Sequence, residues 1–213
     1  MSNAKEAARL SPDNRCEQIL GVARIHFARE DQDAVSIQSI ANDAGVARAL
    51  VYHYFPGRDA LLSAVLQREA EGLLAATAPR DGFTPYENLE HALGAYLDHV
   101  ASCTGRLREL YMPRPAMASL VADLVTRNHA TQVERILSQL PAEHDSPVTR
   151  LGIAGWLGFV VAAARQSETH SGISRSEIIQ LCLHALSGAT GIGLDQLREA
   201  PASRQLHQKE TCR

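Results

Sequence analysis

Five side chains of types that can bind phosphates or nucleic-acid bases are concentrated between residues 48 and 58 of this chain. They are Arg48, Tyr52, His53, Tyr54 and Arg58. An arginine donates two parallel hydrogen bonds to guanine, whereas tyrosine and histidine can hold phosphate oxygens. Arg48 and Tyr52 are four residues apart, so they share one face of a helix. The spacing therefore predicts a helix surface that contacts a nucleic acid.

Two short apolar patterns, joined at one glycine, would position this surface. Ser36 is suited to begin the first helix, and the apolar residues of that helix repeat at the spacing of one face. These residues are Ile37, Ile40, Ala41 and Ala44. Gly45 then stands where a left-handed residue ends a helix, and a second helix begins near Ala47 with Val46, Leu50 and Val51 facing inward. A helical hairpin in any bundle shows the same pattern, so periodicity alone leaves that alternative open.

Residues 15–66 resemble the DNA-binding head of the tetracycline-repressor (TetR-type) family of regulators. The resemblance lies in the run Ile40-Ala41-Asn42-Asp43-Ala44-Gly45-Val46 and in the run from Tyr52-His53-Tyr54-Phe55-Pro56-Gly57-Arg58 to Leu62. It implies that the second helix lies in the major groove of a DNA operator. Two positions depart from the family pattern, because Ala47 replaces a hydroxyl residue and Leu50 replaces a common threonine.

The resemblance also implies a role for single positions of the head. Arg48 and Gln38 would read bases, and the small side chain of Ala49 would let the backbone approach the base edges. The implied phosphate contacts are Ser36, Tyr52, His53, Tyr54 and Arg58. Arg58 follows Pro56-Gly57 in the first turn of a helix, where its charge and the free backbone amides can face one phosphate.

Composition predicts a soluble globular protein whose basic surface is local. The 213 residues carry a formal net charge of −3, from 21 basic and 24 acidic residues. Such a chain does not attract DNA as a whole. Between Val46 and Arg58 the only formal charges are Arg48 and Arg58. We therefore expect modest nonspecific affinity and reliance on two copies matched to DNA geometry.

Cysteine spacing and hydropathy predict a cytoplasmic protein without a membrane partner. The four cysteines are Cys16, Cys103, Cys182 and Cys212. No two of them form a Cys-x-x-Cys pair, which argues against a zinc knuckle or a disulfide framework. We expect Cys103 and Cys182 to serve as small buried apolar residues; the alternative is that one of them is a redox-sensing thiol. The longest uncharged stretch, residues 151–164, is shorter than the about 20 residues of a membrane span, and charged residues interrupt the start of the chain where a signal peptide would lie.

Proline and capping signals predict an all-α chain of about nine helices. Ser11-Pro12 begins the first helix, Thr84-Pro85-Tyr86-Glu87 combines a capping box with proline at the first helical position, and Ser146-Pro147 begins another helix. Pro113 and Pro115 separate a short sixth helix from a seventh that ends near Leu140. We assign residues 11–60 to a three-helix helix-turn-helix DNA-binding domain, with a helix over 58–78 as the connection. Residues 79–195 form a larger effector-binding and dimerisation domain, and residues 196–213 form a mobile tail.

In the helix that begins at Ser146-Pro147, residues 151–164 are apolar on every side and include three glycines, so we expect this stretch to be covered on all sides. The capping box from Ser174 to Glu177 begins the next helix, which has its own apolar stripe. We expect these two helices to pair with their copies as a four-helix homodimer interface; the alternative is that both are core of a monomer. The predicted interface residues are Gly152, Gly155, Gly158, Ile178, Leu181, Cys182, Ala185 and Leu186.

The middle of the chain should hold the pocket of a small-molecule effector if the family plan applies. An apolar cavity with a few polar points suits such a ligand. The predicted lining residues are Tyr96, His99, Cys103, Tyr111, Met112, Met117, His129 and Trp156. Glu87 and His91 could bind a metal, but two ligands without a third are a weak site, so we expect neither metal nor cofactor.

These observations predict a sequence-specific DNA-binding transcription regulator, as a homodimeric repressor released from its operator by a small molecule. No Gly-x-Ser-x-Gly, His-Glu-x-x-His, Walker or dinucleotide-binding glycine pattern is present, so we expect no enzymatic activity. One alternative is an activator, or a regulator that responds to a partner protein or to thiol oxidation through the same head. Another is a helical protein that sequesters a ligand and has lost DNA function.

Overall fold

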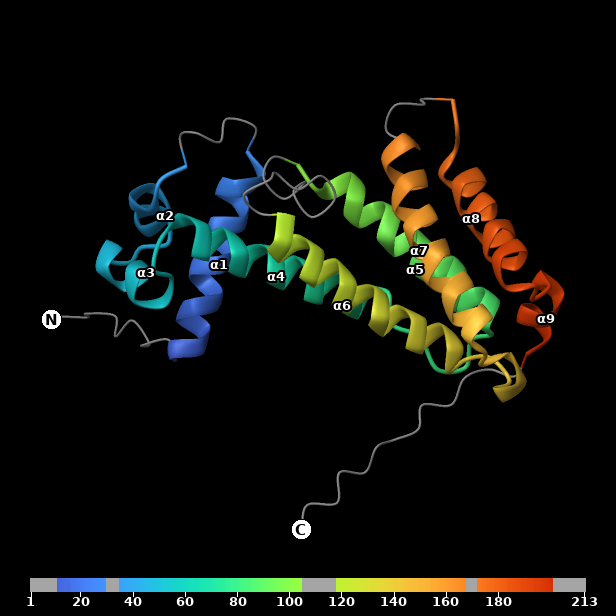
Figure 1. The fold of residues 1–213 in the computed structure, drawn as a ribbon. Helices are drawn as coiled ribbons and strands as arrows, with labels where there is room; N and C mark the ends of the chain where they lie inside the picture. The colour runs from blue at the N-terminus through green and yellow to red at the C-terminus, as the bar shows by residue number, and fades with distance from the viewer. Residues whose placement is uncertain (1–10, 30–34, 105–117, 168–171, 201–213) are drawn as a thin grey trace, which may run out of the picture. The chain divides into compact units, whose positions relative to one another are not determined.

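The computed structural model describes residues 11–29, 35–104, 118–167 and 172–200, and every regular element among them is helical (Figure 1). The α-helices in these ranges are α1 (Pro12–Ala28), α2 (Ile37–Asp43), α3 (Arg48–Tyr54), α4 (Arg58–Ala76), α5 (Pro85–Ser102), α6 (Ala118–Leu137), α7 (Pro147–Ser167), α8 (Arg175–Thr190) and α9 (Leu194–Glu199). A short 3-10 helix covers Ala142–His144. The predicted all-α class is confirmed. The predicted short helix before Pro113 lies outside the described residues.

The chain divides into two compact units. Residues 1–69 with 103–109 form the first, and residues 70–102 with 110–213 form the second. Helix α4 is continuous across this division, because its residues 58–69 belong to the first unit and its residues 70–76 to the second. One helix therefore leads from the head into the larger unit.

In the first unit, α1 supplies the surface on which the short helices α2 and α3 rest. Its buried residues are Ile19, Leu20, Ala23, His26 and Phe27. The ring nitrogen Nε2 of His26 lies 2.7 Å from Oδ2 of Asp43 at the end of α2, and Nε2 of Gln18 donates to the carbonyl oxygen of Ala44 at 3.0 Å. These two contacts hold the C-terminal end of α2 against α1, which fixes where the chain turns into α3.

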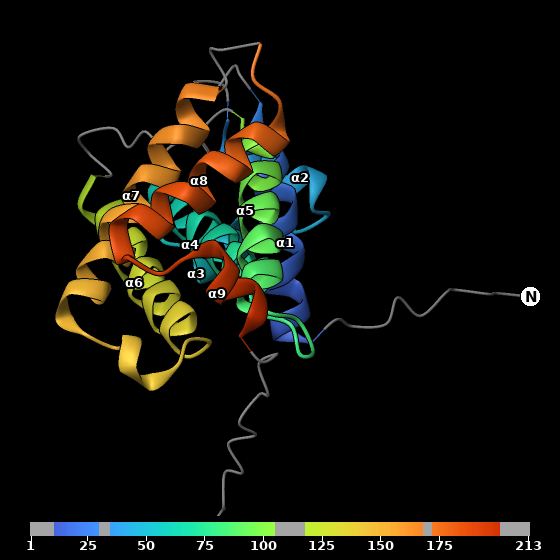
Figure 2. The same cartoon turned by 90° about the vertical axis from the view of Figure 1, so that its right-hand side faces the viewer.

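The second unit is a bundle in which α7 and α8 run side by side (Figures 1 and 2). The indole Nε1 of Trp156 on α7 donates to the buried carbonyl of Cys182 on α8 at 2.7 Å. A Cβ at Gly152 would lie only 2.5 Å from the backbone oxygen of Ala189. Gly152 therefore allows the two helix backbones to approach closely, as small residues do at helix crossings.

The prediction of a mobile tail over residues 196–213 is wrong for residues 196–199, because they belong to α9 (Leu194–Glu199). Gly191 has φ 73° and ends α8 in the left-handed conformation. The chain then turns back onto the core, where Ile192 is 4% exposed and Leu197 is 2% exposed. A short helix with one buried leucine is held by tertiary packing rather than by its own propensity, which is why the polar sequence concealed it.

The expectation that α7 is covered on all sides is also wrong for the single chain. One face is buried through Ile153, Trp156 and Val160, but Val148 is 75% and Leu151 74% exposed. The sequence predicted a segment too short to cross a membrane, whereas α7 as folded has 21 residues and is, by length and composition alone, apolar enough for a span. Its buried face packs in the protein core, with the indole of Trp156 bonded to α8, so the exposed apolar face is the feature that requires an explanation.

Candidate nucleic-acid interface and ligand cavity

The hairpin of α2 and α3 is closed by local interactions that the sequence specifies. Oγ of Ser36 accepts a hydrogen bond from the backbone N–H of Ser39 at 3.0 Å, and Ser39 Oγ donates back to the carbonyl of Ser36 at 2.8 Å. Gly45 has φ 63°, so the predicted left-handed turn is confirmed. Ala47 precedes α3 without any side-chain capping bond. The first amides of α3 are therefore left without a side-chain cap, as the alanine in place of a hydroxyl residue predicts.

Helix α3 buries one side and exposes the side that carries the predicted base reader. Val51 is 0% exposed, whereas Arg48, Ala49 and His53 are exposed and Tyr52 is 42% exposed. Nη2 of Arg48 donates to the hydroxyl of Tyr52 at 3.1 Å, and the guanidinium carbon lies 5.2 Å from the centre of the Tyr52 ring. This hydrogen bond and cation–π contact hold the arginine along the helix face, ready to be presented to a partner.

The other predicted DNA contacts have more varied surroundings. Ser36 is exposed, but its oxygen already caps α2. Gln38 is exposed and donates to Oδ1 of Asn42 at 2.9 Å. Tyr54 is half-buried, with its hydroxyl 3.4 Å from the carbonyl of Pro12 at the start of α1. Arg58 is half-buried as the first residue of α4. The exposed group therefore consists of Arg48, Ala49, Tyr52, His53, Gln38 and Ser36, while Tyr54 also fastens α3 to α1.

The second unit contains a cavity of about 350 Å³ between the C-terminal part of α4 and helices α5, α6 and α7. Three of the predicted pocket residues, Tyr96, His129 and Trp156, line it. His99 and Cys103 do not line it. Tyr111, Met112 and Met117 lie outside the described residues. The walls are mainly leucine, valine and alanine, and the volume is at the lower end of small-molecule pockets.

A row of polar side chains on α6, which the sequence analysis missed, lines the same cavity. It consists of Asn128, Gln132 and Arg135, and each of them bonds to the C-terminal part of α4 or to the residue that follows it. Asn128 donates to the carbonyl of Ala70 at 3.3 Å, Gln132 to Oγ1 of Thr77 at 2.6 Å, and Arg135 to the carbonyl of Leu74 at 2.6 Å. A polar stripe at spacings of four and three residues on an otherwise amphipathic helix is the signal that could have revealed it.

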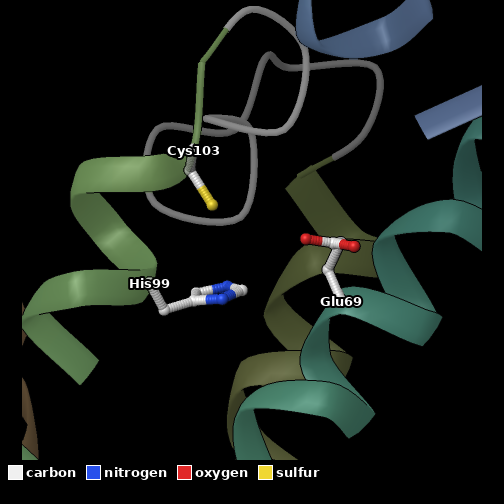
Figure 3. A group of neighbouring side chains, drawn as sticks. All are labelled: Glu69, His99 and Cys103. Atoms are coloured by element: carbon white, nitrogen blue, oxygen red, sulfur yellow. The ribbon is translucent and has the colours of Figure 1, made fainter. Parts of the chain in front are cut away.

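The two buried cysteines of the described residues, Cys103 and Cys182, are poorly placed for redox sensing. Cys103 is 2% exposed, and its sulfur lies within 4.8 Å of a carboxylate oxygen of Glu69 on α4 (Figure 3). Cys182 is also 2% exposed, and burial raises the pKa of its thiol to about 11. A thiolate is the reactive form of cysteine, so at neutral pH Cys182 is an inert apolar residue of the core.

Glu87 is occupied by a structural role that leaves little for a metal. Its Oε2 accepts hydrogen bonds from the backbone N–H of Thr84 at 2.7 Å and from the Thr84 hydroxyl at 3.0 Å. These bonds, which cap α5, lower the pKa of the Glu87 carboxyl. The predicted capping box at Thr84 is therefore confirmed.

The predicted dimer residues separate into two groups. Ile178, Cys182 and Leu186 are buried in the core of the same chain, and Gly152 packs against the backbone of Ala189. The assignment of Ile178, Cys182 and Leu186 to an interface with another copy is wrong, because these side chains are buried within the chain. Gly152 is half-buried and lies with Val148, Leu151 and Gly155 along a surface hollow of α7 and α8. Gly155 and Gly158 are exposed, Leu181 is 55% exposed and Ala185 is half-buried.

These outward residues form part of an apolar strip over the two helices. We call the strip the α7–α8 apolar face and define it as Val148, Leu151, Gly155, Gly158, Phe159, Leu181 and Ala185. A Cβ placed at Gly155 or Gly158 would meet no atom of the described chain within 4 Å. The face is therefore open, and contiguous exposed apolar surfaces of this kind mark interaction sites.

Comparisons with known proteins concern the head and the whole fold. Residues 19–65 match the model of a family described as bacterial regulatory proteins, tetR family. The chain is 26% identical over 156 residues to the transposon Tn10 TetC protein of Escherichia coli, a match that covers 70% of this chain and 79% of that protein. A tetR-family transcriptional regulator from Streptomyces coelicolor has 26% identity and a TM-score of 0.70, with 88% of this chain and 86% of that chain covered. A TetR-like transcriptional regulator from Rhodococcus sp. RHA1 shares the fold at 24% identity and a TM-score of 0.59, with 86% and 100% covered.

Proposed function

We propose that this chain, which is a TetR-type regulator, acts as a homodimeric repressor that leaves its operator when a small molecule binds. The observation that carries the proposal is the position of Arg48. It lies exposed on a short helix that follows a left-handed glycine, inside the residues that match the tetR family. A helix held at such a turn is the element that helix-turn-helix proteins insert into the major groove.

In this proposal the residues of the head divide into base readers and phosphate contacts. Arg48 donates to guanine, and Gln38 exchanges its intramolecular bond with Asn42 for a bond to a base. Tyr52, His53 and Arg58 hold phosphates and set the orientation of α3, with Ser36 and Tyr54 beside them. The net charge of −3 means that the whole chain offers DNA little general attraction, so two heads are needed for tight binding.

The DNA test compares two arginines of the head with one outside it. Arg48→Ala should cost about 1–3 kcal/mol of discrimination between operator and mismatched DNA. Arg58→Ala should weaken binding to all sequences and lower the salt slope by about one. The control is Arg165→Ala, which removes an exposed arginine at the end of α7 and should leave both quantities unchanged. Fluorescence anisotropy at several salt concentrations measures them. Parent-like operator binding by both head variants would show that the contact assignment is wrong.

Dimerisation is proposed through the α7–α8 apolar face, with a second copy of the chain as its partner. The face is supported by the exposure of Leu151, at 74%, and of Leu181, at 55%. It is also supported by the open space over Gly155, which lets another helix approach. A twofold axis is what places two recognition helices on neighbouring half-sites of an operator.

The dimer test introduces a charge into the face. Leu151→Glu and Leu181→Glu should convert a dimer into a folded monomer, since both side chains are exposed within the chain. Ile25→Glu is the matched control, because Ile25 on α1 is 55% exposed and lies outside the face. Sedimentation velocity reads the mass, and circular dichroism checks the fold. A monomeric parent at micromolar concentration would remove the dimer from the proposal.

Release from DNA is proposed to start in the cavity of the second unit. The cavity is lined by Ala70, Leu73, Leu74 and Thr77, and the same stretch of chain continues α4 from the head. A ligand that moves α4 would change the separation or tilt of the two heads. The ligand must bind the form that does not fit DNA more tightly, by about 1–3 kcal/mol for ordinary coupling.

The alternatives are an activator or a partner- or thiol-responsive regulator with the same head, and a ligand-sequestering protein that does not bind DNA. Different measurements separate them from the proposed repressor. Transcription in vitro from the operator distinguishes a repressor from an activator. Loss of DNA binding after mild oxidation would favour a thiol-responsive regulator, although the buried Cys182 offers little reactive thiolate. Ligand binding without any affinity for double-stranded DNA from the genomic neighbourhood would favour a sequestering protein.

A further inference from the structure

The charge on the described residues that line the cavity is positive only. Among the described lining residues there is no aspartate or glutamate, and Arg135 is the one side chain with a permanent charge. His129 also lines the cavity, and burial lowers the pKa of its imidazole, so it is neutral at pH 7. A cationic ligand would be buried here without a counter-charge, which is unfavourable. The cavity therefore suits neutral or anionic molecules.

Arg135 holds its charge without an acidic partner among the described residues. Its Nη1 donates to the carbonyl of Leu74 at 2.6 Å, and no aspartate or glutamate in the described part of the chain forms an ion pair with it. The adjacent Glu134 is paired with Arg150 instead. A guanidinium has five N–H donors in a planar fork that matches a carboxylate. Arg135 is thus able to receive an anion.

The neighbours of Arg135 on α6 add neutral donors and acceptors at the same wall. Gln132 donates to Thr77 and Asn128 to Ala70, so both amide side chains face the C-terminal part of α4 and the residue that follows it. The wall on α7 is apolar and includes Trp156 and Val160, whereas α5 contributes the apolar Leu93 together with Asn88 and Tyr96. The charged group of the cavity therefore lies on α6, and the α7 wall is apolar.

We propose that the effector is an amphipathic monoanion whose carboxylate binds Arg135 and whose apolar body fills the cavity. A carboxylate that binds the two Nη groups end-on competes with the carbonyl of Leu74 for the Nη1 donor of Arg135. Leu74 lies in the last turn of α4, where carbonyl groups have no partner within the helix. Binding of the anion therefore withdraws a bond that holds the end of α4. The step from ligand binding to DNA release rests on the proposed function, but the ligand class does not.

The experiment uses three probes of equal chain length, decanoate, decanol and decylammonium, with the full-length protein. Trp156 is the single tryptophan of the chain and lines the cavity, so its fluorescence reports binding directly. In the parent, decanoate should bind about 10–100-fold more tightly than decanol, as expected for hydrogen bonds to a charged group, and decylammonium should bind most weakly.

Variants of one position test the role of Arg135. Arg135→Gln should abolish the preference for decanoate while retaining decanol binding, and Arg135→Lys should restore part of it. Arg127→Gln is the matched control, because it makes the same change on α6 at an exposed residue that does not line the cavity. Far-ultraviolet circular dichroism confirms that each variant is folded.

Three results would overturn the inference. The first is equal or tighter binding of decanol or decylammonium to the parent. The second is no binding of any probe, and the third is an unchanged decanoate preference in a folded Arg135→Gln variant. Operator binding is measured separately in the presence of each probe. If decanoate binds through Arg135 without releasing DNA, the ligand class stands and the proposed release fails; if another class of molecule releases DNA, the release stands and the ligand class fails.

Discussion

Replacement of Gly152 by alanine tests whether this glycine serves packing within the chain. The added Cβ would lie 2.5 Å from the backbone oxygen of Ala189 and 3.1 Å from its carbonyl carbon. Ordinary contact begins near 3.4 Å, so α7 and α8 must separate by roughly 1 Å, and a gap of that size forfeits about a quarter to a half of each dispersion contact along the seam. Because the obstacle is backbone, no side chain can rotate away from it.

The free-energy change has two opposing parts. Overpacking costs about 1–3 kcal/mol, whereas replacing glycine by alanine inside a helix gains about 1 kcal/mol. Gly72→Ala is the matched control, because Gly72 is an exposed residue of α4 and no atom of the described residues lies within 4 Å of the added Cβ. The two variants share the helix gain, so the difference between them isolates the clash, at about 1–3 kcal/mol.

Thermal unfolding followed by circular dichroism measures this difference. For a chain of this length each kcal/mol shifts Tm by about 2–4 °C, so Gly152→Ala should melt roughly 2–12 °C below Gly72→Ala. Urea titration should show the same order with an unchanged slope, as expected when only stability changes. Equal melting temperatures of the two variants would refute the close approach of α7 to α8 at this glycine.

Further predictions concern the face, the cavity and the core. Gly155→Ala should stabilise the folded chain by up to about 1 kcal/mol, since no atom of the described residues meets the new methyl group. The same variant should weaken self-association measured by sedimentation, and unchanged association would argue against Gly155 as an interface residue. Burial lowers the pKa of His129 below its ordinary 6.5, so the unfolded chain binds the proton more readily than the folded chain. The free energy of unfolding should therefore fall as pH drops below about 6.5. If Tm of His129→Gln falls with acid as steeply as that of the parent, this account is contradicted. The pKa of Cys182 is raised to about 11 by burial, so iodoacetamide at pH 8 should label Cys182 only after unfolding, and rapid labelling of the native protein, read by peptide mass, would exclude the buried position. Ser174→Ala should cost about 1 kcal/mol in urea unfolding, because Ser174 Oγ accepts from the N–H of Glu177; an unchanged midpoint would mean that the cap contributes nothing.

The sequence was informative wherever the deciding interaction is between near neighbours in the chain. The caps at Ser36 and Ser174 join residues three apart. Gly45 has a positive φ, which glycine adopts without the strain that a Cβ would cause. The exposed side of α3 followed from helical periodicity, since Val51 faces inward and Arg48 outward. The helical class and the likeness of the head to known regulators needed no coordinates.

The cavity and the apolar face required contacts between residues far apart in the chain. No pattern in α6 alone reveals that Arg135 reaches the carbonyl of Leu74, 61 positions away. Periodicity could not tell which residues of α8 face α7, so buried Cys182 and exposed Leu181 were placed in one stripe. It also gave no reason for Leu197 to be buried, because α9 is too short to be stable by itself.

The sequence by itself thus indicated most of the helices, their capped ends and the exposed side of α3, because hydrogen bonds and backbone conformation within a few residues fix these features. Only the tertiary structure decided which apolar side chains lie inside the chain, which remain on the α7–α8 apolar face and which polar groups line the cavity. The physical reason is that burial depends on how helices pack against one another, and one helix sequence is compatible with several packing partners.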